Sequence, residues 1–159
     1  MPHVRIFFDS AAYAFSWDVV CLEPTMRETY SLEGRVAIVT GASRGIGEAI
    51  ARSLLSHGAR VVVSSRKMDD GALSDVPSDR ILRVASHAGK ESDCQALVER
   101  AVAHFGSVDI LVNNAATNPH FGPMLDVDMA AWDKTFEVNL KGYFWMMRAV
   151  AKHLLDAKR

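Results

Sequence analysis

The stretch RVAIVTGASRGIG, residues 35–47, decides the fold of this chain. Its first six residues are mostly β-branched and end at Gly41, which is typical of a strand buried on both faces of a parallel sheet. From Ile46 onward, apolar residues recur at Ile50 and Leu54, and Gly58 follows where a left-handed helix cap would fall. The stretch therefore predicts a strand, a glycine-rich turn and an amphipathic helix.

The same alternation repeats along the rest of the chain. Runs typical of strands lie at 60–64, 81–85 and 108–112. Helices are expected at 94–105, closed by Gly106, and from 128 to 157 with an interruption near 139–142. Strands that alternate with helices favour right-handed βαβ units. We predict an α/β fold with a Rossmann-type doubly wound parallel sheet, incomplete because about four strands are visible where a complete sheet has about six.

Residues 1–30 differ from the rest. The segment FFDSAAYAFSW, residues 7–17, is rich in aromatic residues but keeps neither a helix nor a strand period. We interpret residues 1–30 as a disordered or non-native leader, with Met26 as an alternative start. The other interpretation is a segment that docks on the sheet.

The composition favours a small molecule as the ligand of this protein. The formal net charge of -1 gives no electrostatic reason to expect nucleic acid or a membrane surface as a partner, and no apolar run reaches the roughly 18 residues of a membrane span. Cys21 and Cys94 show neither CxxC nor Cys/His spacing, so we expect no metal site and read both as ordinary thiols. The expected location is the cytoplasm.

The glycine loop TGASRGIG, residues 40–47, has the strand-to-helix context of a dinucleotide-binding loop. Gly41 would permit the tight turn, Gly45 would let the backbone approach a pyrophosphate, and Gly47 would let the helix pack close to the sheet. The helix N-terminus would offer free N–H groups to the phosphates. The alternative is a tight turn that binds no ligand.

Three motifs resemble, in the same order, those of the short-chain dehydrogenase/reductase family. They are the Gly-x3-Gly-x-Gly loop, NNAA at 113–116, and VNL at 138–140. The resemblance runs from about Leu32 to the C-terminus and implies that residues 31–159 are the N-terminal part of an NAD(P)-binding Rossmann domain. It also implies an oxidoreductase acting on carbonyl or alcohol groups. The loop 113–122 resembles the carbonyl-reductase branch of the family, that of the member-four dehydrogenase/reductases.

The end of the second predicted strand indicates which cofactor is used. An Asp or Glu there would bind the ribose 2′-OH of NAD, whereas an arginine accommodates the 2′-phosphate of NADP. The chain has SSRK at 64–67, so we expect NADP(H); the alternative is a solvated Arg-Lys turn. The residues expected to bind the cofactor are Gly41, Ser43, Arg44, Gly45, Ile46, Gly47, Ser65, Arg66, His87, Asn114 and Ala115.

Two positions depart from the family pattern. Ala116 replaces a usual glycine, which requires a backbone conformation that tolerates Cβ. His87 stands where the family usually has an Asp that accepts a hydrogen bond from the adenine amino group. A neutral imidazole can also accept one bond, and the alternative is a solvated loop histidine.

The family resemblance also implies a catalytic tetrad, of which only Asn139 is present; its family role is to break the helix and hold a proton-relay water. The family's tyrosine is followed four residues later by a lysine. Here the residues that follow the tyrosines at that spacing are Trp17 after Tyr13, Gly34 after Tyr30 and Met147 after Tyr143. We therefore expect this chain itself to be inactive, with a nucleotide-binding or interaction fragment as the alternative function. A full-length family member would be a homo-oligomer.

Overall fold

The computed structural model describes residues 30–68 and 71–158. The expected leader, except for Tyr30, and Cys21 lie outside the described residues. Within these ranges, no helix is both long enough and apolar enough to cross a membrane.

Four parallel strands form one sheet, in the order β3-β2-β1-β4. They are β1 (Val36–Thr40), β2 (Arg60–Ser65), β3 (Ile81–Ala85) and β4 (Ile110–Val112). The central strand β1 pairs with both β2 and β4, so that Ile38 lies between Val62 and Leu111. This order matches the first four positions of the Rossmann sheet, and the predicted α/β parallel fold is confirmed.

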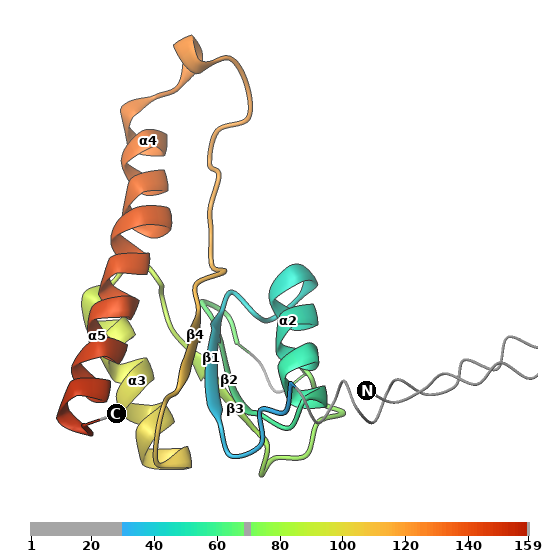
Figure 1. The fold of residues 1–159 in the computed structure, drawn as a ribbon. Helices are drawn as coiled ribbons and strands as arrows, with labels where there is room; N and C mark the ends of the chain where they lie inside the picture. The colour runs from blue at the N-terminus through green and yellow to red at the C-terminus, as the bar shows by residue number, and fades with distance from the viewer. Residues whose placement is uncertain (1–29, 69–70, 159) are drawn as a thin grey trace, which may run out of the picture.

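Helices cover both faces of the sheet (Figure 1). Helix α2 (Gly45–Ser56) lies on one face, and α3 (Glu91–Phe105) and α5 (Gly142–Asp156) lie on the other. Alternate residues of β1 enter the two cores: Val36 and Ile38 pack with α3 and α5, and Ala37 and Val39 pack with α2. Every residue of β1 is buried, as its β-branched sequence predicts.

Strand β4 begins later than predicted, at Ile110 rather than at 108. The Asp109 carboxylate accepts a hydrogen bond from the Val36 N–H at 2.9 Å, and the Asp109 N–H donates to the Val36 carbonyl at 2.8 Å. The Asp109 carboxylate therefore accepts from the first N–H of β1, which a backbone carbonyl of a longer β4 would otherwise do.

The ends of the later helices lie close to where the sequence predicts them. Helix α3 ends at Gly106, whose φ of 84° is the predicted left-handed cap. After β4 the chain runs away from the sheet, forms the short 3-10 helix η1 (Met124–Asp126) and enters α4 (Met129–Phe136) (Figure 1). The π-helical turn η2 (Glu137–Lys141) joins α4 to α5, which confirms the interruption predicted near 139–142.

Candidate functional site

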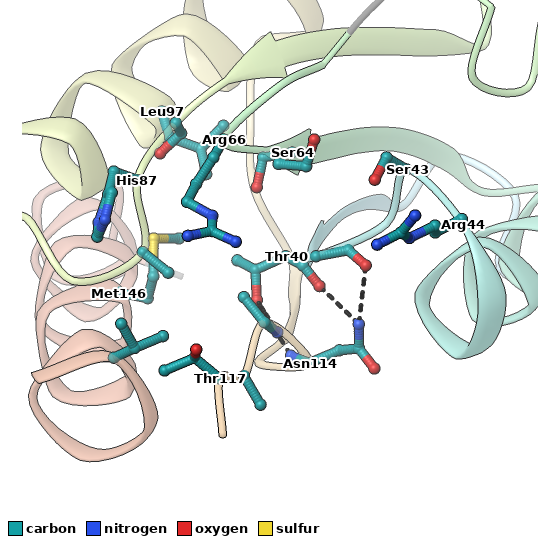
Figure 2. Close-up of a pocket in the computed structure, with 17 residues that line it drawn as sticks. Thr40, Ser43, Arg44, Ser64, Arg66, His87, Leu97, Asn114, Thr117 and Met146 are labelled. Carbon is teal, nitrogen blue, oxygen red and sulfur yellow. Dashed lines mark hydrogen bonds between the residues drawn. The ribbon is translucent and has the colours of Figure 1, made fainter. Parts of the chain in front are cut away.

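A pocket of about 310 Å³ lies at the carboxyl ends of the strands, where β1 turns into α2 (Figure 2). Its walls come from the glycine loop and from the segments that follow β2, β3 and β4, with one side closed by α3, η2 and α5. The lining residues are Thr40, Gly41, Ser43, Arg44, Ser64, Ser65, Arg66, Ser86, His87, Ala88, Leu97, Asn114, Ala115, Ala116, Thr117, Val138 and Met146.

Most of the residues that the sequence predicts for the site meet in this pocket. Those among the lining are Gly41, Ser43, Arg44, Ser65, Arg66, His87, Asn114 and Ala115. The predicted residues Gly45, Ile46, Gly47 and Asn139 do not line it. Ile46 projects into solvent with 76% of its surface exposed.

The glycines of the loop serve different purposes. Gly41 and Gly45 have φ of 67° and 62°, a conformation that favours glycine. A Cβ on Gly41 would lie 2.8 Å from the Ala115 Cα, whereas one on Gly45 would meet no atom within 4 Å. Space above Gly45 is therefore open for a ligand to approach the backbone.

Gly47 was expected to let α2 pack close to the sheet, but the atoms nearest to it belong to the glycine loop and to Asn114. A Cβ there would collide with the Gly41 carbonyl oxygen and would lie 2.5 Å from Asn114 Nδ2. Gly47 thus lets the glycine loop close against the loop that follows β4.

Thr40, whose role no sequence motif indicates, connects these two loops. Its hydroxyl oxygen accepts hydrogen bonds from the backbone N–H groups of Asn114 and Ala115, both at 3.0 Å. In return, Asn114 Nδ2 donates to the carbonyls of Thr40 and Gly41 at 2.9 and 3.1 Å (Figure 2). The pocket floor is consequently built from paired groups, so its shape is set before any ligand arrives.

Asn139 fixes the opposite wall. Its Oδ1 accepts from the Thr117 N–H at 2.8 Å and its Nδ2 donates to the Thr117 carbonyl at 2.9 Å. Both ends of the amide are occupied, so the side chain positions Thr117 and does not itself face the pocket.

The loop after β4 accommodates its unusual alanine without strain. Among the described residues other than glycine, positive φ occurs at Leu73 and Lys158. Ala116 therefore has an ordinary backbone conformation, which is compatible with its Cβ.

Two arginines supply the charge of the pocket. Arg44 precedes α2 and Arg66 follows β2, and Figure 2 shows both guanidinium groups beside the same space. No Asp or Glu is among the lining residues that the structure describes. Next to Arg66, the buried Ser65 Oγ has no hydrogen-bond partner within the described part of the chain. An unpaired buried hydroxyl is costly, and an anionic oxygen would satisfy it.

His87 lies two residues beyond β3 and also faces the pocket. Its backbone N–H donates to Asp93 Oδ2 at 2.9 Å, and its ring Nδ1 accepts the Gly89 N–H at 3.1 Å. The ring is therefore held by its own loop, which differs from the solvated loop histidine considered as the alternative.

Comparison with known proteins places these features in a family. The family model for short chain dehydrogenases matches residues 35–159. A curated relative, dehydrogenase/reductase SDR family member 4 of Pongo abelii, is 40% identical over 146 residues, covering 89% of this chain and 52% of the relative. The chain thus spans about half the length of the curated relatives it matches.

Solved structures of other proteins have a similar fold over the part that they share with this chain. A 3-ketoacyl-(acyl-carrier-protein) reductase from Brucella melitensis, complexed with NADH, superposes with a TM-score of 0.72 at 38% identity, over 79% of this chain and 52% of that one. A metagenomic short-chain oxidoreductase in complex with NADP gives 0.70 at 40% identity, over 80% of this chain and 60% of that one.

Proposed function

The chain belongs to the short-chain dehydrogenase family, and on that premise we propose that it carries the NADP(H)-binding part of an oxidoreductase acting on carbonyl or alcohol substrates. The positive charge of the pocket is the observation that favours NADP(H) over NAD(H). Arg44 and Arg66 border it, and none of its described lining residues is a carboxylate. A ribose 2′-phosphate is stabilised by such a site, whereas the 2′-OH of NAD needs an acidic partner there.

The residues present fit the phosphates of a dinucleotide. Space above Gly45 admits a pyrophosphate to the N-terminus of α2, where unpaired N–H groups and the helix dipole favour an anion. The unsatisfied Ser65 hydroxyl and Arg66 would hold the 2′-phosphate at the end of β2. When bound, NADPH supplies a hydride to a carbonyl carbon, and the chain's own residues bind and orient it.

A second candidate function is binding without turnover by this chain. Its described tyrosines, Tyr30 and Tyr143, are followed four residues later by Gly34 and Met147, and neither tyrosine lines the pocket. A positioned general acid contributes roughly 10²–10⁴-fold to such a reaction. Without one, a chain with an intact cofactor pocket would act as a nucleotide-binding or interaction fragment.

The wider setting is proposed on composition and family. A near-neutral net charge of -1 supports a small-molecule substrate and gives no attraction for nucleic acid or a membrane surface. We place the protein in the cytoplasm, and we expect a homo-oligomer for the full-length family member.

The deciding experiment is a titration of the chain with NADPH and with NADH, followed by nicotinamide fluorescence. We expect NADPH to bind at least about tenfold more tightly, because the charged partner of the 2′-phosphate is worth more than about 1.4 kcal/mol. Equal affinities would contradict the proposal. Loss of NADPH absorbance in the presence of a reactive dicarbonyl would separate an active enzyme from a binding fragment.

A further inference from the structure

The two ends of the pocket differ in their chemistry. The end near the glycine loop is polar and carries Ser43, Arg44 and Ser65. The other end, where Figure 2 shows His87, Leu97 and Met146 grouped together, is lined mainly by apolar side chains. Leu97 and Met146 are each 1% exposed, so they form a packed apolar wall, and His87 is one of the polar groups beside it.

The topology indicates what the apolar end would hold. In a sheet of this kind the glycine loop after β1 would face the pyrophosphate, and the end of β2 would face the ribose of the adenosine half. In the observed order β3-β2-β1-β4, the adenosine half would therefore extend toward β3. A flat base fits an apolar slot, and the segment after β3 places His87 and Ala88 beside it.

The tautomer of His87 is set by its neighbour. Gly89 donates its backbone N–H to His87 Nδ1 at 3.1 Å. A backbone N–H is only a donor, so Nδ1 must carry a lone pair, and the neutral ring then carries its proton on Nε2. The free nitrogen of His87 is consequently a hydrogen-bond donor, which corrects the expectation that the ring would accept a bond from adenine.

Close packing around Gly89 holds the His87 ring in place. A Cβ on Gly89 would lie 2.7 Å from Glu137 Oε1 and 3.2 Å from His87 Cε1, so the carboxylate and the imidazole meet at this glycine. Glu137 also accepts a hydrogen bond from Lys134 Nζ at 2.8 Å, which lowers the pKa of its carboxyl and keeps it ionised. A larger residue at position 89 would therefore displace the imidazole or the carboxylate.

We propose that His87 is a specificity-determining residue that donates a hydrogen bond to an acceptor on the purine and does not select the exocyclic amino group of adenine. This inference rests on the proposed NADP(H) function. Adenine offers ring nitrogens as hydrogen-bond acceptors. Hypoxanthine offers ring nitrogens and also a carbonyl oxygen, which takes the place of the amino group of adenine. A carboxylate at position 87 would have the opposite preference, because it can only accept.

The test compares NADPH with its hypoxanthine analogue, deamino-NADPH, by isothermal titration of the chain. We expect the analogue to bind no more than about threefold more weakly than NADPH, because a donor at His87 gains no bond from the amino group. In the His87→Asp variant we expect at least about a tenfold preference for NADPH, because the new carboxylate accepts from the amino group. His104→Asp makes the same change on an exposed face of α3, away from the pocket, and should leave the ratio unchanged.

A second readout does not depend on the cofactor. Long-range ¹H–¹⁵N correlation spectra of the chain report the tautomer of each histidine, and His87 should show a protonated Nε2. A protonated Nδ1, or a wild-type preference for NADPH of tenfold or more, would overturn the inference and leave the proposed function intact. If neither dinucleotide binds, the proposed function fails and this inference fails with it.

Discussion

The side-chain amide of Asn139 is bonded at both ends to the backbone of Thr117, 22 positions earlier in the chain. Asn139 lies in the π-helical turn between α4 and α5, and Thr117 lines the pocket. The helix interruption therefore places the Asn139 amide beside Thr117, a residue of the pocket wall. The two hydrogen bonds connect the segment after β4 to the continuous helical stretch formed by α4, η2 and α5.

The Asn139→Asp variant tests this connection. The carboxylate can still accept from the Thr117 N–H, but its second oxygen faces the Thr117 carbonyl where the amide donated. We expect a loss of about 1–3 kcal/mol in the free energy of unfolding, measured by urea denaturation. The matched control is Asn118→Asp in the same loop, where the side chain is exposed and the expected change is within about 0.5 kcal/mol. Equal losses in the two variants would contradict a specific role for Asn139.

Thr40 offers a comparison between two nearly isosteric changes. Thr40→Val keeps the β-branched shape in β1 but removes the oxygen that accepts the N–H groups of Asn114 and Ala115. Two donors are left unpaired, so we expect a loss of about 2–4 kcal/mol. Thr40→Ser keeps the oxygen and removes one methyl group, with an expected loss of about 1 kcal/mol. If serine destabilised the chain as much as valine in urea denaturation, packing and not hydrogen bonding would explain the role of Thr40.

The fold was predictable because its signals are local. The β-branched run at 36–40, the helical period at 94–105 and the cap at Gly106 each reflect a preference of a few neighbouring residues. The start of β4 was not predictable in the same way, because Asp109 bonds to Val36, which is 73 positions away.

The site likewise contains features that local sequence predicts and features that depend on contacts between distant residues. The spacing of the glycines between a strand and a helix identifies the glycine loop, and the position of Arg66 after β2 identifies it as a cofactor-binding candidate. Thr40 reads in sequence as one more β-branched strand residue, and its hydroxyl acquires a role only when residues 114 and 115 fold against it. The tautomer of His87 likewise depends on the Gly89 amide, whose direction follows from the turn and not from residue type.

Removal of Arg66 should separate the two nicotinamide cofactors. Arg66→Ala would lose charge-assisted hydrogen bonds to the 2′-phosphate, so we expect NADPH affinity to fall roughly ten- to a hundredfold, or about 1.5–3 kcal/mol, with little effect on NADH. Fluorescence titration gives both affinities. Arg100→Ala, on an exposed part of α3 outside the pocket, is the control. An equal fall for NADH would show that Arg66 does not act on the 2′-phosphate.

Cys94 should resist alkylation in the folded chain. Its side chain is fully buried, and its Sγ donates to the Ala88 carbonyl at 3.4 Å. Burial, with smaller effects of Asp93 and Glu91, raises the pKa of the thiol to about 11. At pH 8.5 the thiolate fraction is then well under 1%, against about half for an ordinary thiol with a pKa of about 8.5.

The measurement is iodoacetamide labelling of a Cys21→Ser variant, read by mass spectrometry with and without urea. We expect labelling at least about a hundredfold slower in the folded state. Because the folded pKa lies above the unfolded one, the contribution of the neutral thiol to stability is complete below about pH 8.5 and is lost as the pH rises toward 11. Rapid labelling of the native chain would mean that Cys94 is accessible.

An apolar face along α4, η2 and α5 is open to solvent in this chain. Its residues recur three or four positions apart, and their exposed fractions are 46% for Trp132, 40% for Phe136, 60% for Leu140, 52% for Phe144 and 52% for Met147. Side chains this large seldom gather on the surface of a soluble monomer, and such a face binds hydrophobic dyes. We therefore expect the native chain to enhance anilinonaphthalene sulfonate fluorescence.

The double variant Leu140→Glu with Phe144→Lys places opposite charges four residues apart on this face, a spacing that supports a helix. We expect dye fluorescence to fall by at least about half while far-ultraviolet circular dichroism stays the same, because apolar surface is removed and the helix is kept. Ser92→Glu, an exposed change on α3, controls for added charge. If the double variant bound dye as strongly as the wild type, the dye would be reporting a loosely packed core, since the face itself would no longer offer a continuous apolar surface.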